Sequence, residues 1–531
     1  MKRFLCLFCA LFMVLTCGCS SITSDEKCDH DFELVKTVDA SCTQDGYKKY
    51  KCDDCGETDI EDIPKKGHVF VDGSCTVCGE RNDDIVPGLD FESPEDATGY
   101  DGSYVTITFT HTMGPKLQDV LNTYIEEFNK IYPNIRIQHE SAGGWDDING
   151  VINSAIAADI APNIAYCYPD HVAMYNNAQS VIVLDDLINS NATNAGTNEI
   201  LGLTAAQKAD FFESFYNEGM VYGDGKIYTM PMSKSTEVLY YNKTFFNEHD
   251  LSVPTTWDEM WEVCAQIKAI DPSCYPLGYD AEDNWFITLC EQMKSGYTSA
   301  EDGGKYLFNN DTNKAFVKDL CEMYQKGYFT TQMLYGSYTS SLFVETTDTR
   351  CYMCVGSSAS ASYQMSNLDT ADGSFAFEVG VAPIPQYDSS NNKAISWGPS
   401  LCILKNSDTS QQEIFASWLF VKFLCTNANF QAEFSMASGY MPTLKSVANH
   451  PNYAAWLASG NGYENLVAKC VHVCIDNANS YFVPDAFNGS ADARTEVSDL
   501  LFRCLSSSAT GSELDYIINR LFEYAIDECE Y

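Results

Sequence analysis

Residues 104–113 read Tyr-Val-Thr-Ile-Thr-Phe-Thr-His-Thr-Met, and this stretch decides the fold class. Three apolar residues alternate with threonines, a period of two that is typical of a β-strand. Gly-Pro follows, and apolar residues then recur every three or four positions to residue 131, which predicts an amphipathic helix. Another strand begins after Pro133. The order strand, helix, strand indicates an α/β layered sheet.

The end of this first strand carries the polar residues Thr110, His111 and Thr112. Sheets of this kind bind ligands at the carboxyl ends of their strands. His111 is therefore a candidate ligand contact. The alternative is a buried histidine that only forms hydrogen bonds inside the protein.

Length and charge limit the classes of function. The 531 residues are enough for two or three domains. The formal net charge is 32 − 74 = −42. A surface this acidic repels nucleic acid and anionic membranes, since a protein that binds either one needs a positively charged surface. It also disfavours a strongly anionic ligand.

The first 18 residues predict a lipoprotein signal peptide. Lys2 and Arg3 precede a short apolar run, and small residues precede Cys19, which two serines follow. Cleavage before Cys19 would leave its thiol to carry lipid. We expect a chain held by lipid at the extracellular face of the membrane of a Gram-positive-type or wall-less bacterium. The alternative is an ordinary secretory signal.

Residues 19–80 predict a small Cys/His module of the zinc-ribbon kind. Two Cys-x-x-Cys-Gly turns are typical of structural zinc sites, because each aims two thiolates at one ion. Eight ligand side chains are enough for two four-coordinate zinc sites. A segment with so few apolar residues needs a structural metal ion or a similar cross-link to fold. The predicted ligands are Cys28, His30, Cys42, Cys52, Cys55, His68, Cys75 and Cys78. Three disulfides are the alternative.

The module also resembles a ribbon-like repeat of Gram-positive surface proteins. In that repeat Cys-x-x-Cys-Gly is followed by Ile-Pro and Gly-His, which here are residues 52–56, 63–64 and 67–68. Residues 81–102 are acidic and contain two prolines, so they predict a linker. The thirteen cysteines beyond it occur mostly in apolar contexts, as small core residues do.

A series of short motifs in the rest of the chain resembles the extracellular solute-binding proteins, family 1, of ABC importers. They are Val-Leu-Tyr-Tyr-Asn-Lys at 238–243, Leu-x-x-Pro-x-Thr-Trp at 251–257, and the segments 352–359, 397–401 and 438–442. Members of that group bind sugars, oligosaccharides and glycerol phosphates. Thr256 and Glu259 also form a capping-box pattern that predicts a helix from Trp257 onward.

The resemblance implies two α/β lobes joined by crossing segments, with the ligand in the cleft between them. The solute-binding domain would cover 103–531. Its first lobe would hold about 103–232 and 393–430, and its second about 236–392 and 431–531. Closure of such a cleft is a hinge motion. The closed form would deliver its solute to the permease subunits of an ABC importer.

Carbohydrate binding needs aromatic faces and short polar groups. The candidates at positions that match the family, or at loop ends, are His111, Trp145, Tyr168, Ser235, Trp285, Ser357, Ser358, Trp397, Gly398 and Tyr440. Each has a structural alternative, which is packing for the aromatic residues and a turn or cap for the serines.

The predicted class of ligand rests on one difference between this sequence and the glycerol-phosphate-binding relatives. Glycerol-phosphate relatives carry a basic residue in the loop before the final helices, whereas residues 482–490 contain none and the next is Arg494. Phosphate recognition favours arginine. We therefore expect a neutral sugar or oligosaccharide, with no catalysis and no cofactor in this domain. The alternatives are a glycerol-phosphate ligand, which Lys234 would partly support, a secreted carbohydrate hydrolase, or a surface adhesin.

Overall fold

The computed structural model describes residues 31–65 except 43, residues 70–71 and 74–75, and residues 99–530 except 196, 198, 346–349, 366–374 and 460–462. The chain divides into two compact units between residues 89 and 90. The predicted lipid site and four predicted zinc ligands lie outside the described residues: Cys19, Cys28, His30, His68 and Cys78. Within the described part, no helix is long and apolar enough to cross a membrane.

The first unit contains a three-stranded antiparallel sheet. Its central strand β2 (Gly46–Cys52) pairs with β1 (Phe32–Val38) and β3 (Thr58–Ile63), and a separate ribbon joins β4 (Phe70–Val71) to β5 (Ser74–Cys75). The turn after β2 is closed by a 2.9 Å hydrogen bond from the Gly56 N–H to the Cys52 carbonyl. Gly56 has φ of +76°, which a residue without a Cβ adopts freely. Cys52 is buried and Cys55 exposed.

The second unit begins with the predicted strand, helix and strand. They are β6 (Val105–His111), α1 (Pro115–Ile131) and β7 (Ile135–Ser141), and β6 lies parallel to β7 and to β8 (Ile164–Cys167). Two strands from later in the chain, β18 (Ser400–Ile403) and β9 (Met230–Pro231), complete a sheet of order β7-β6-β8-β18-β9. We call this sheet with its helices the first lobe.

A second sheet lies in the other part of this unit, which we call the second lobe. Its order is β14 (Phe329–Thr331), β11 (Tyr275–Tyr279), β15 (Cys351–Ser357), β10 (Ser233–Asn242), β17 (Ala394–Trp397) and β20 (Tyr481–Phe482). Strands β16 (Val379–Pro383) and β19 (Met441–Pro442) also pair with β10. Strand β11 is parallel to both of its neighbours, so their carboxyl ends meet at one edge.

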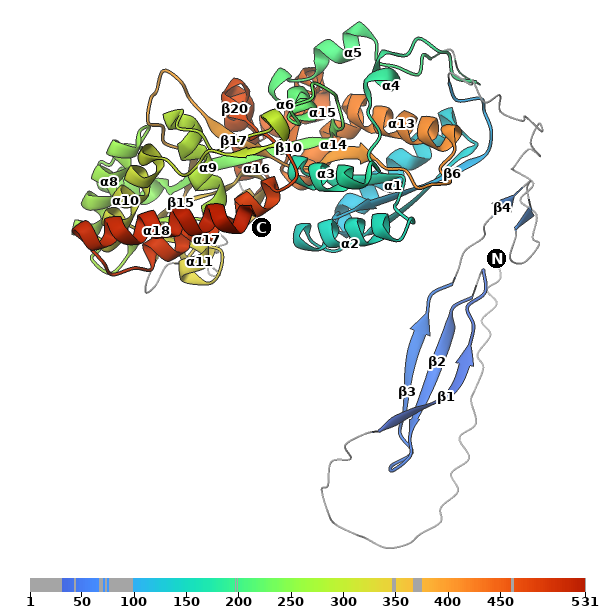
Figure 1. Ribbon diagram of the computed structural model, residues 1–531, viewed down its shortest axis with the longest axis horizontal. Helices are drawn as coiled ribbons and strands as arrows, with labels where there is room; N and C mark the ends of the chain where they lie inside the picture. Colours follow the sequence, from blue (N-terminus) through green and yellow to red (C-terminus); the bar gives the residue numbers. More distant parts are fainter. Residues whose placement is uncertain are drawn as a thin grey trace, which may run out of the picture. The chain divides into compact units, whose positions relative to one another are not determined.

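Helices cover both sheets (Figure 1). In chain order, the helices before β9 are α2 (Trp145–Ala157), α3 (Pro169–Tyr175), α4 (Asp185–Asn189), α5 (Ala205–Asp210) and α6 (Glu213–Asn217). Those after β10 are α7 (Lys243–Glu248), α8 (Trp257–Ile270), α9 (Glu282–Met293), α10 (Asp311–Gln325), α11 (Gln332–Tyr335), α12 (Ser340–Phe343), α13 (Gln411–Thr426), α14 (Ala428–Ser438), α15 (Pro451–Leu457), α16 (Tyr463–Asp476), α17 (Ser490–Leu505) and α18 (Gly511–Cys529). The predicted capping box opens α8. Short strands, 3₁₀ turns and irregular segments make up the remainder.

The chain crosses between the lobes at closely packed backbone. Met232 separates β9 in the first sheet from β10 in the second, and Gly398-Pro399 separates β17 from β18. Gly398 has φ of +124°, and a Cβ there would lie 2.8 Å from the Ser233 carbonyl oxygen. Only glycine fits this crossing without displacing the neighbouring strand.

A buried ion pair lies beside the same crossing. The Lys234 ammonium is 2.5 Å from Glu218 Oε1 and also donates to the Gly398 carbonyl and the Ser400 hydroxyl. Neither charged side chain is more than 2% exposed. All three donors of the ammonium are therefore used inside the protein, and Lys234 has none left for a ligand.

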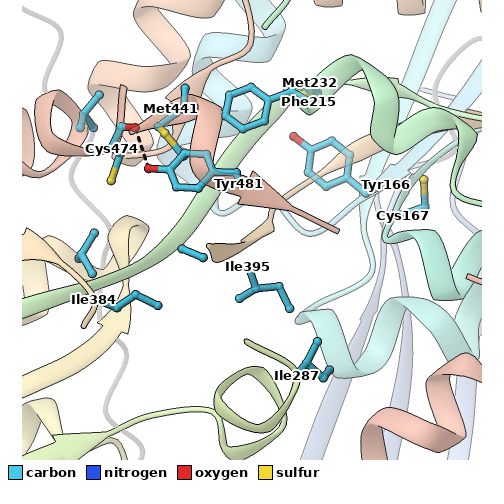
Figure 2. Packing of buried hydrophobic residues seen from close by; sticks show 14 of the residues in the cluster. Tyr166, Cys167, Phe215, Met232, Ile287, Ile384, Ile395, Met441, Cys474 and Tyr481 are labelled. Carbon is cyan, nitrogen blue, oxygen red and sulfur yellow. Dashed lines mark hydrogen bonds between the residues drawn. The ribbon is translucent and has the colours of Figure 1, made fainter. Parts of the chain in front are cut away.

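The core runs continuously through the second unit. Figure 2 shows Ile384, Ile395 and Tyr481 among its members, with the Tyr481 hydroxyl donating to the Cys474 carbonyl at 2.6 Å. The thirteen cysteines of this unit are unpaired thiols, and twelve of them are buried. The prediction that they act as small core residues is confirmed.

Candidate functional site

A cavity of about 680 Å³ opens at the carboxyl ends of β11, β14 and β15. These are the strand ends at which α/β sheets present loops and helix starts to ligands. The central strand β10 and the crossing strand β17 form another side. The lining residues are Ser235, Thr236, Glu237, Asp280, Ala281, Asn284, Gln332, Tyr338, Ser340, Ser357, Ala359, Ser360, Tyr363, Ile395 and Trp397.

The lining contains two buried carboxyl groups. Glu237 accepts a 2.7 Å hydrogen bond from the Tyr279 hydroxyl, and burial raises the pKa of Glu237 to about 8. Asp280 accepts hydrogen bonds from the Thr339 backbone N–H (2.8 Å) and hydroxyl (2.9 Å). Burial raises the pKa of Asp280 to about 6, although both hydrogen bonds oppose the rise.

Aromatic side chains form the apolar part of the wall. Tyr338 is 62% exposed and Tyr363 is 73% exposed, although both line the cavity. Trp397 is partly buried at the crossing. Among the described residues that line the cavity, none is lysine, arginine or histidine. The cavity thus offers aromatic faces, hydroxyl and amide groups, and two acids.

A buried cation packs against Trp397, which lines the cavity. The Arg494 guanidinium carbon is 3.9 Å from the centre of the Trp397 ring. Its Nη1 binds the Asp283 carboxylate and donates to Asn284 Oδ1 at 2.6 Å, while Nε lies 3.4 Å from Asp170 Oδ2. Asp170 belongs to α3 of the first lobe, and Asp283 and Asn284 belong to α9 of the second. Arg494 therefore links the lobes and is shared by two carboxylates.

Ala281 adds a strained backbone to the rim. It has φ of +66°, a left-handed conformation that is uncommon for a residue with a Cβ, and it is the residue before α9. Such outliers persist where the surrounding structure holds them, often next to a ligand site.

Three of the sequence-predicted residues line the cavity: Ser235, Ser357 and Trp397. The Ser235 hydroxyl donates to the Trp397 carbonyl at 3.4 Å, and the Ser357 hydroxyl accepts from the Ala359 N–H at 3.2 Å. Each serine thus has a local structural role as well as its place in the wall.

Three more predicted residues gather on the first-lobe side of Trp397. The rings of Trp145 and Tyr168 stack with centres 4.1 Å apart, and those of Tyr168 and Trp397 lie 4.3 Å apart. Burial raises the pKa of Tyr440, and the neighbouring Trp145 opposes that rise. These aromatic residues pack on one another, and apart from Trp397 they do not line the cavity.

Trp285 is in the core instead of the cleft. It is fully buried, and its ring stacks on Tyr279 with centres 4.2 Å apart. The sequence suggested a loop, but residues 282–293 form α9. Because each helical residue turns the side chain by about 100°, Asn284 can line the cavity while Trp285 faces the sheet.

His111 does not line the cavity either. It is fully buried, and its Nδ1 accepts from the Met113 N–H at 3.1 Å. Its Nε2 must then carry the proton and donate to His139 Nδ1 at 2.9 Å, and His139 Nε2 donates to Asn122 Oδ1. Burial lowers the pKa of His111 to about 4, so this chain of hydrogen bonds is neutral. The alternative role, an internally bonded histidine, is the one observed.

Two further candidates have structural roles beside the cavity. The Ser358 hydroxyl accepts from the Thr236 N–H at 3.1 Å, and Gly398 provides the close backbone approach at the crossing. Neither lines the cavity.

Sequence reasoning missed the two acids and the two exposed tyrosines. Asp280 directly follows β11, and the rule on strand ends would have found it. Glu237 lies in the middle of a strand, which gives no such signal. Tyr338 and Tyr363 lie in short irregular segments after α11 and within a 3₁₀ turn, where no periodicity distinguishes a wall residue from an ordinary surface residue.

Comparisons with known proteins agree with this architecture. Residues 123–459 match a family described as bacterial extracellular solute-binding proteins. The sn-glycerol-3-phosphate-binding periplasmic protein of Pectobacterium atrosepticum is 24% identical over 351 residues, which are 63% of this chain and 72% of that protein.

Solved structures are similar in fold. The sugar-binding protein MalE of Xanthomonas citri has a TM-score of 0.61 at 18% identity, over 80% of this chain and 99% of that one. UgpB of Mycobacterium tuberculosis, solved with glycerophosphocholine, has a TM-score of 0.60 at 18% identity, over 80% and 100%. At this identity the likeness establishes the two-lobed fold and leaves the ligand open.

Proposed function

The chain belongs to the bacterial extracellular solute-binding proteins, and we propose that its solute is a sugar or oligosaccharide without an anionic group. Within this family it acts as a solute-binding receptor of the sugar and glycerol-phosphate importer class and not as an enzyme. The observation that carries the proposal is the composition of the cavity. Exposed Tyr338 and Tyr363 offer faces for the apolar sides of sugar rings, and the hydroxyl, amide and carboxyl groups match sugar hydroxyls.

A glycerol-phosphate ligand is the alternative that the relatives raise. A phosphate needs donors and positive charge, and arginine is the usual source of both. Lys234 is fully buried and bound to Glu218, and Arg494 is shared by Asp170 and Asp283. Lys234 has no donor left, and the charge of Arg494 is shared by two carboxylates, although its Nη2 forms no hydrogen bond among the described residues. A phosphate in this cavity would face Glu237 and Asp280 with little compensation. This disfavours the phosphate ligand.

Cleft closure would complete the mechanism. Ligand bound against the second lobe and Trp397 would be enclosed when the first lobe rotates about the crossings at Met232 and Gly398. The closed form would then be recognised by the permease of an ABC importer. The Trp145–Tyr168 stack, next to Trp397, is the first-lobe surface that such closure would press on the ligand.

A thermal-shift screen tests this proposal. Neutral mono- and oligosaccharides, polyols and glycerol phosphodiesters are compared on the purified chain without its first 19 residues, because only a true ligand raises the melting temperature by linkage. We expect a saccharide to bind at micromolar Kd or tighter, equivalent to about −8 kcal/mol or better. A shift with phosphodiesters alone would overturn the ligand class, and release of reducing sugar would indicate a hydrolase.

The chain before residue 103 is a further part of the proposal. Cys19 would carry lipid, and the module at 19–80 would hold structural zinc. A hydrogen bond from the Gly56 N–H to the Cys52 carbonyl closes the turn that carries Cys52 and Cys55, the turn on which a two-thiolate site would be built. Among the described residues no three donor side chains converge on one point, and four of the eight predicted ligands lie outside them. Metal analysis of the reduced chain should find up to two zinc ions, and blocked thiols without zinc would indicate disulfides instead.

A further inference from the structure

Both faces of the Trp397 ring are covered, although the ring lines the cavity. The Arg494 guanidinium carbon lies 3.9 Å from the ring centre, and the centre of the Tyr168 ring lies 4.3 Å from it. Stacked carbon atoms approach to about 3.5 Å and no closer. Two planar groups at these distances do not fit on one face of the ring, so they lie on opposite faces. In this structure Trp397 therefore presents only its edge to the cavity, and neither face is open to a sugar ring.

The two groups that cover Trp397 belong to different lobes. Arg494 lies on α17 and Trp397 on β17, both in the second lobe, whereas Tyr168 is the residue before α3 of the first lobe. When the lobes part, Tyr168 leaves the ring and Arg494 stays on it. Tyr168 thus covers the one face of Trp397 that lobe motion exposes to a solute.

Three buried polar atoms at the same contact between the lobes have no partner. Within the described residues, Arg494 Nη2, the Tyr297 hydroxyl and His171 Nδ1 form no hydrogen bond. His171 follows Tyr168 on α3, with ring centres 5.2 Å apart. Burial raises the pKa of Tyr297 well above its usual value and Arg494 lowers it, so the Tyr297 hydroxyl lies in the field of this guanidinium. Buried polar atoms without a partner are costly, and native proteins rarely keep them.

The charges at this contact suit a neutral hydroxylated group better than an anion. Arg494 is bound by both Asp170 and Asp283, so these three side chains together carry one negative charge. Burial lowers the pKa of His171, so its ring adds no charge at neutral pH. A sugar hydroxyl accepts a hydrogen bond from an N–H or O–H donor without bringing charge of its own.

A single sugar ring meets both requirements of this contact. Its apolar face stacks on an aromatic ring, and its hydroxyl oxygens accept hydrogen bonds. Resting on the proposed function, we propose that one ring of the solute inserts between Tyr168 and Trp397 and accepts hydrogen bonds from the Tyr297 hydroxyl and from Arg494 Nη2. The rest of the solute extends into the cavity that Trp397 borders.

Calorimetry on Tyr297→Phe tests the hydrogen bond. The probes are glucose trisaccharides with α-1,4 or β-1,4 links, and the one that binds more tightly is used. Its affinity should fall about two- to twelvefold, the range of one neutral hydrogen bond. The melting temperature of the ligand-free variant should stay the same or rise, because a buried hydroxyl without a described partner is removed. A purely structural hydroxyl would give the opposite pattern, a lower melting temperature with unchanged affinity.

Stopped-flow tryptophan fluorescence on Tyr168→Ala tests the insertion. Because Tyr168 has to leave Trp397 before the solute stacks there, the association rate of the same trisaccharide should rise about two- to twelvefold, the range of one aromatic contact. Tyr166→Phe is the matched control for Tyr297→Phe. It removes another buried hydroxyl without a partner among the described residues, in the first-lobe core against Phe109, and should change neither affinity nor association rate.

The possible results separate this inference from the proposed function. Unchanged affinity or a lower melting temperature in Tyr297→Phe, or an association rate that does not rise in Tyr168→Ala, would overturn the inference. Trisaccharide binding by the unchanged protein would still support the proposed function in each of these cases. If no neutral saccharide, the trisaccharides included, raises the melting temperature of the unchanged protein, the proposed function itself fails.

Discussion

Lys234→Met should destabilise the protein strongly although Lys234 does not line the cavity. Lys234 is fully buried and Glu218 is 2% exposed, so the pair is screened by little water. The variant removes the 2.5 Å contact to Glu218 and the hydrogen bonds to Gly398 and Ser400. Glu218 keeps only the 2.7 Å bond from the Ser400 hydroxyl among the bonds described for its carboxylate. Breaking one side of a buried ion pair costs about 3–5 kcal/mol, and we expect a loss in this range.

Urea unfolding followed by tryptophan fluorescence and circular dichroism measures this loss as a lower midpoint at unchanged slope. Lys130→Met is the control, because its pair with Glu127 is exposed and contributes below about 1 kcal/mol. The double variant Lys234→Met with Glu218→Gln should recover much of the loss, since no charge is then left buried. A loss below about 1 kcal/mol in Lys234→Met, or a double variant as unstable as the sum of both single variants, would refute the reasoning.

Three further predictions concern two buried residues, His111 and Trp285, and one residue of the cavity wall, Tyr363. Burial lowers the pKa of His111 to about 4, while a histidine in the unfolded chain titrates at about 6.5, so the unfolded state takes up the proton first as pH falls. The free energy of unfolding should therefore drop by up to about 3 kcal/mol between these two pH values. Urea midpoints measured at several pH values should fall with pH less steeply in His111→Gln, and an equally steep fall in the variant would contradict this. Trp285→Ala truncates a core side chain and should lower the free energy of unfolding by about 3–5 kcal/mol. A variant with unchanged stability in urea unfolding and no saccharide binding would instead show that Trp285 contacts the ligand. Tyr363→Ala should leave the melting temperature nearly unchanged and weaken saccharide affinity about two- to twelvefold, from the roughly 0.5–1.5 kcal/mol of an aromatic contact. Unchanged affinity by calorimetry would place this ring outside the site.

Periodicity and a capping pattern predicted an early element in each lobe, because local sequence decides such elements. The alternation at 104–113 and the capping box at Thr256 and Glu259 are both observed. The site was predicted less well, because it depends on which side of an element a residue faces after tertiary packing. Trp285 and Asn284 are neighbours in sequence, yet the rotation of about 100° between them in α9 places Trp285 in the core and Asn284 on the cavity wall.

Charge was also hard to read from sequence alone. Lys234 appeared available to a phosphate because it adjoins Ser235, which does line the cavity. Its partner Glu218 lies sixteen residues earlier, in a short 3₁₀ turn, and no local pattern links the two. Arg494 is similarly neutralised by acids from two distant helices. The formal charge of a residue therefore says little about its use until its long-range partners are known.

Strand β10 joins the hinge to the binding site within four residues. Lys234 faces Glu218 and the crossing at Gly398, whereas Ser235 and Glu237 line the cavity. The three residues that follow Lys234, from Ser235 to Glu237, all line the cavity, so one short segment anchors the crossing at its start and borders the ligand site directly after it. Rotation of the lobes about this crossing would leave Glu237 fixed in the second lobe while the first-lobe stack of Trp145 and Tyr168 moves. The ligand's position would thus be set by the second lobe, and its enclosure by the first.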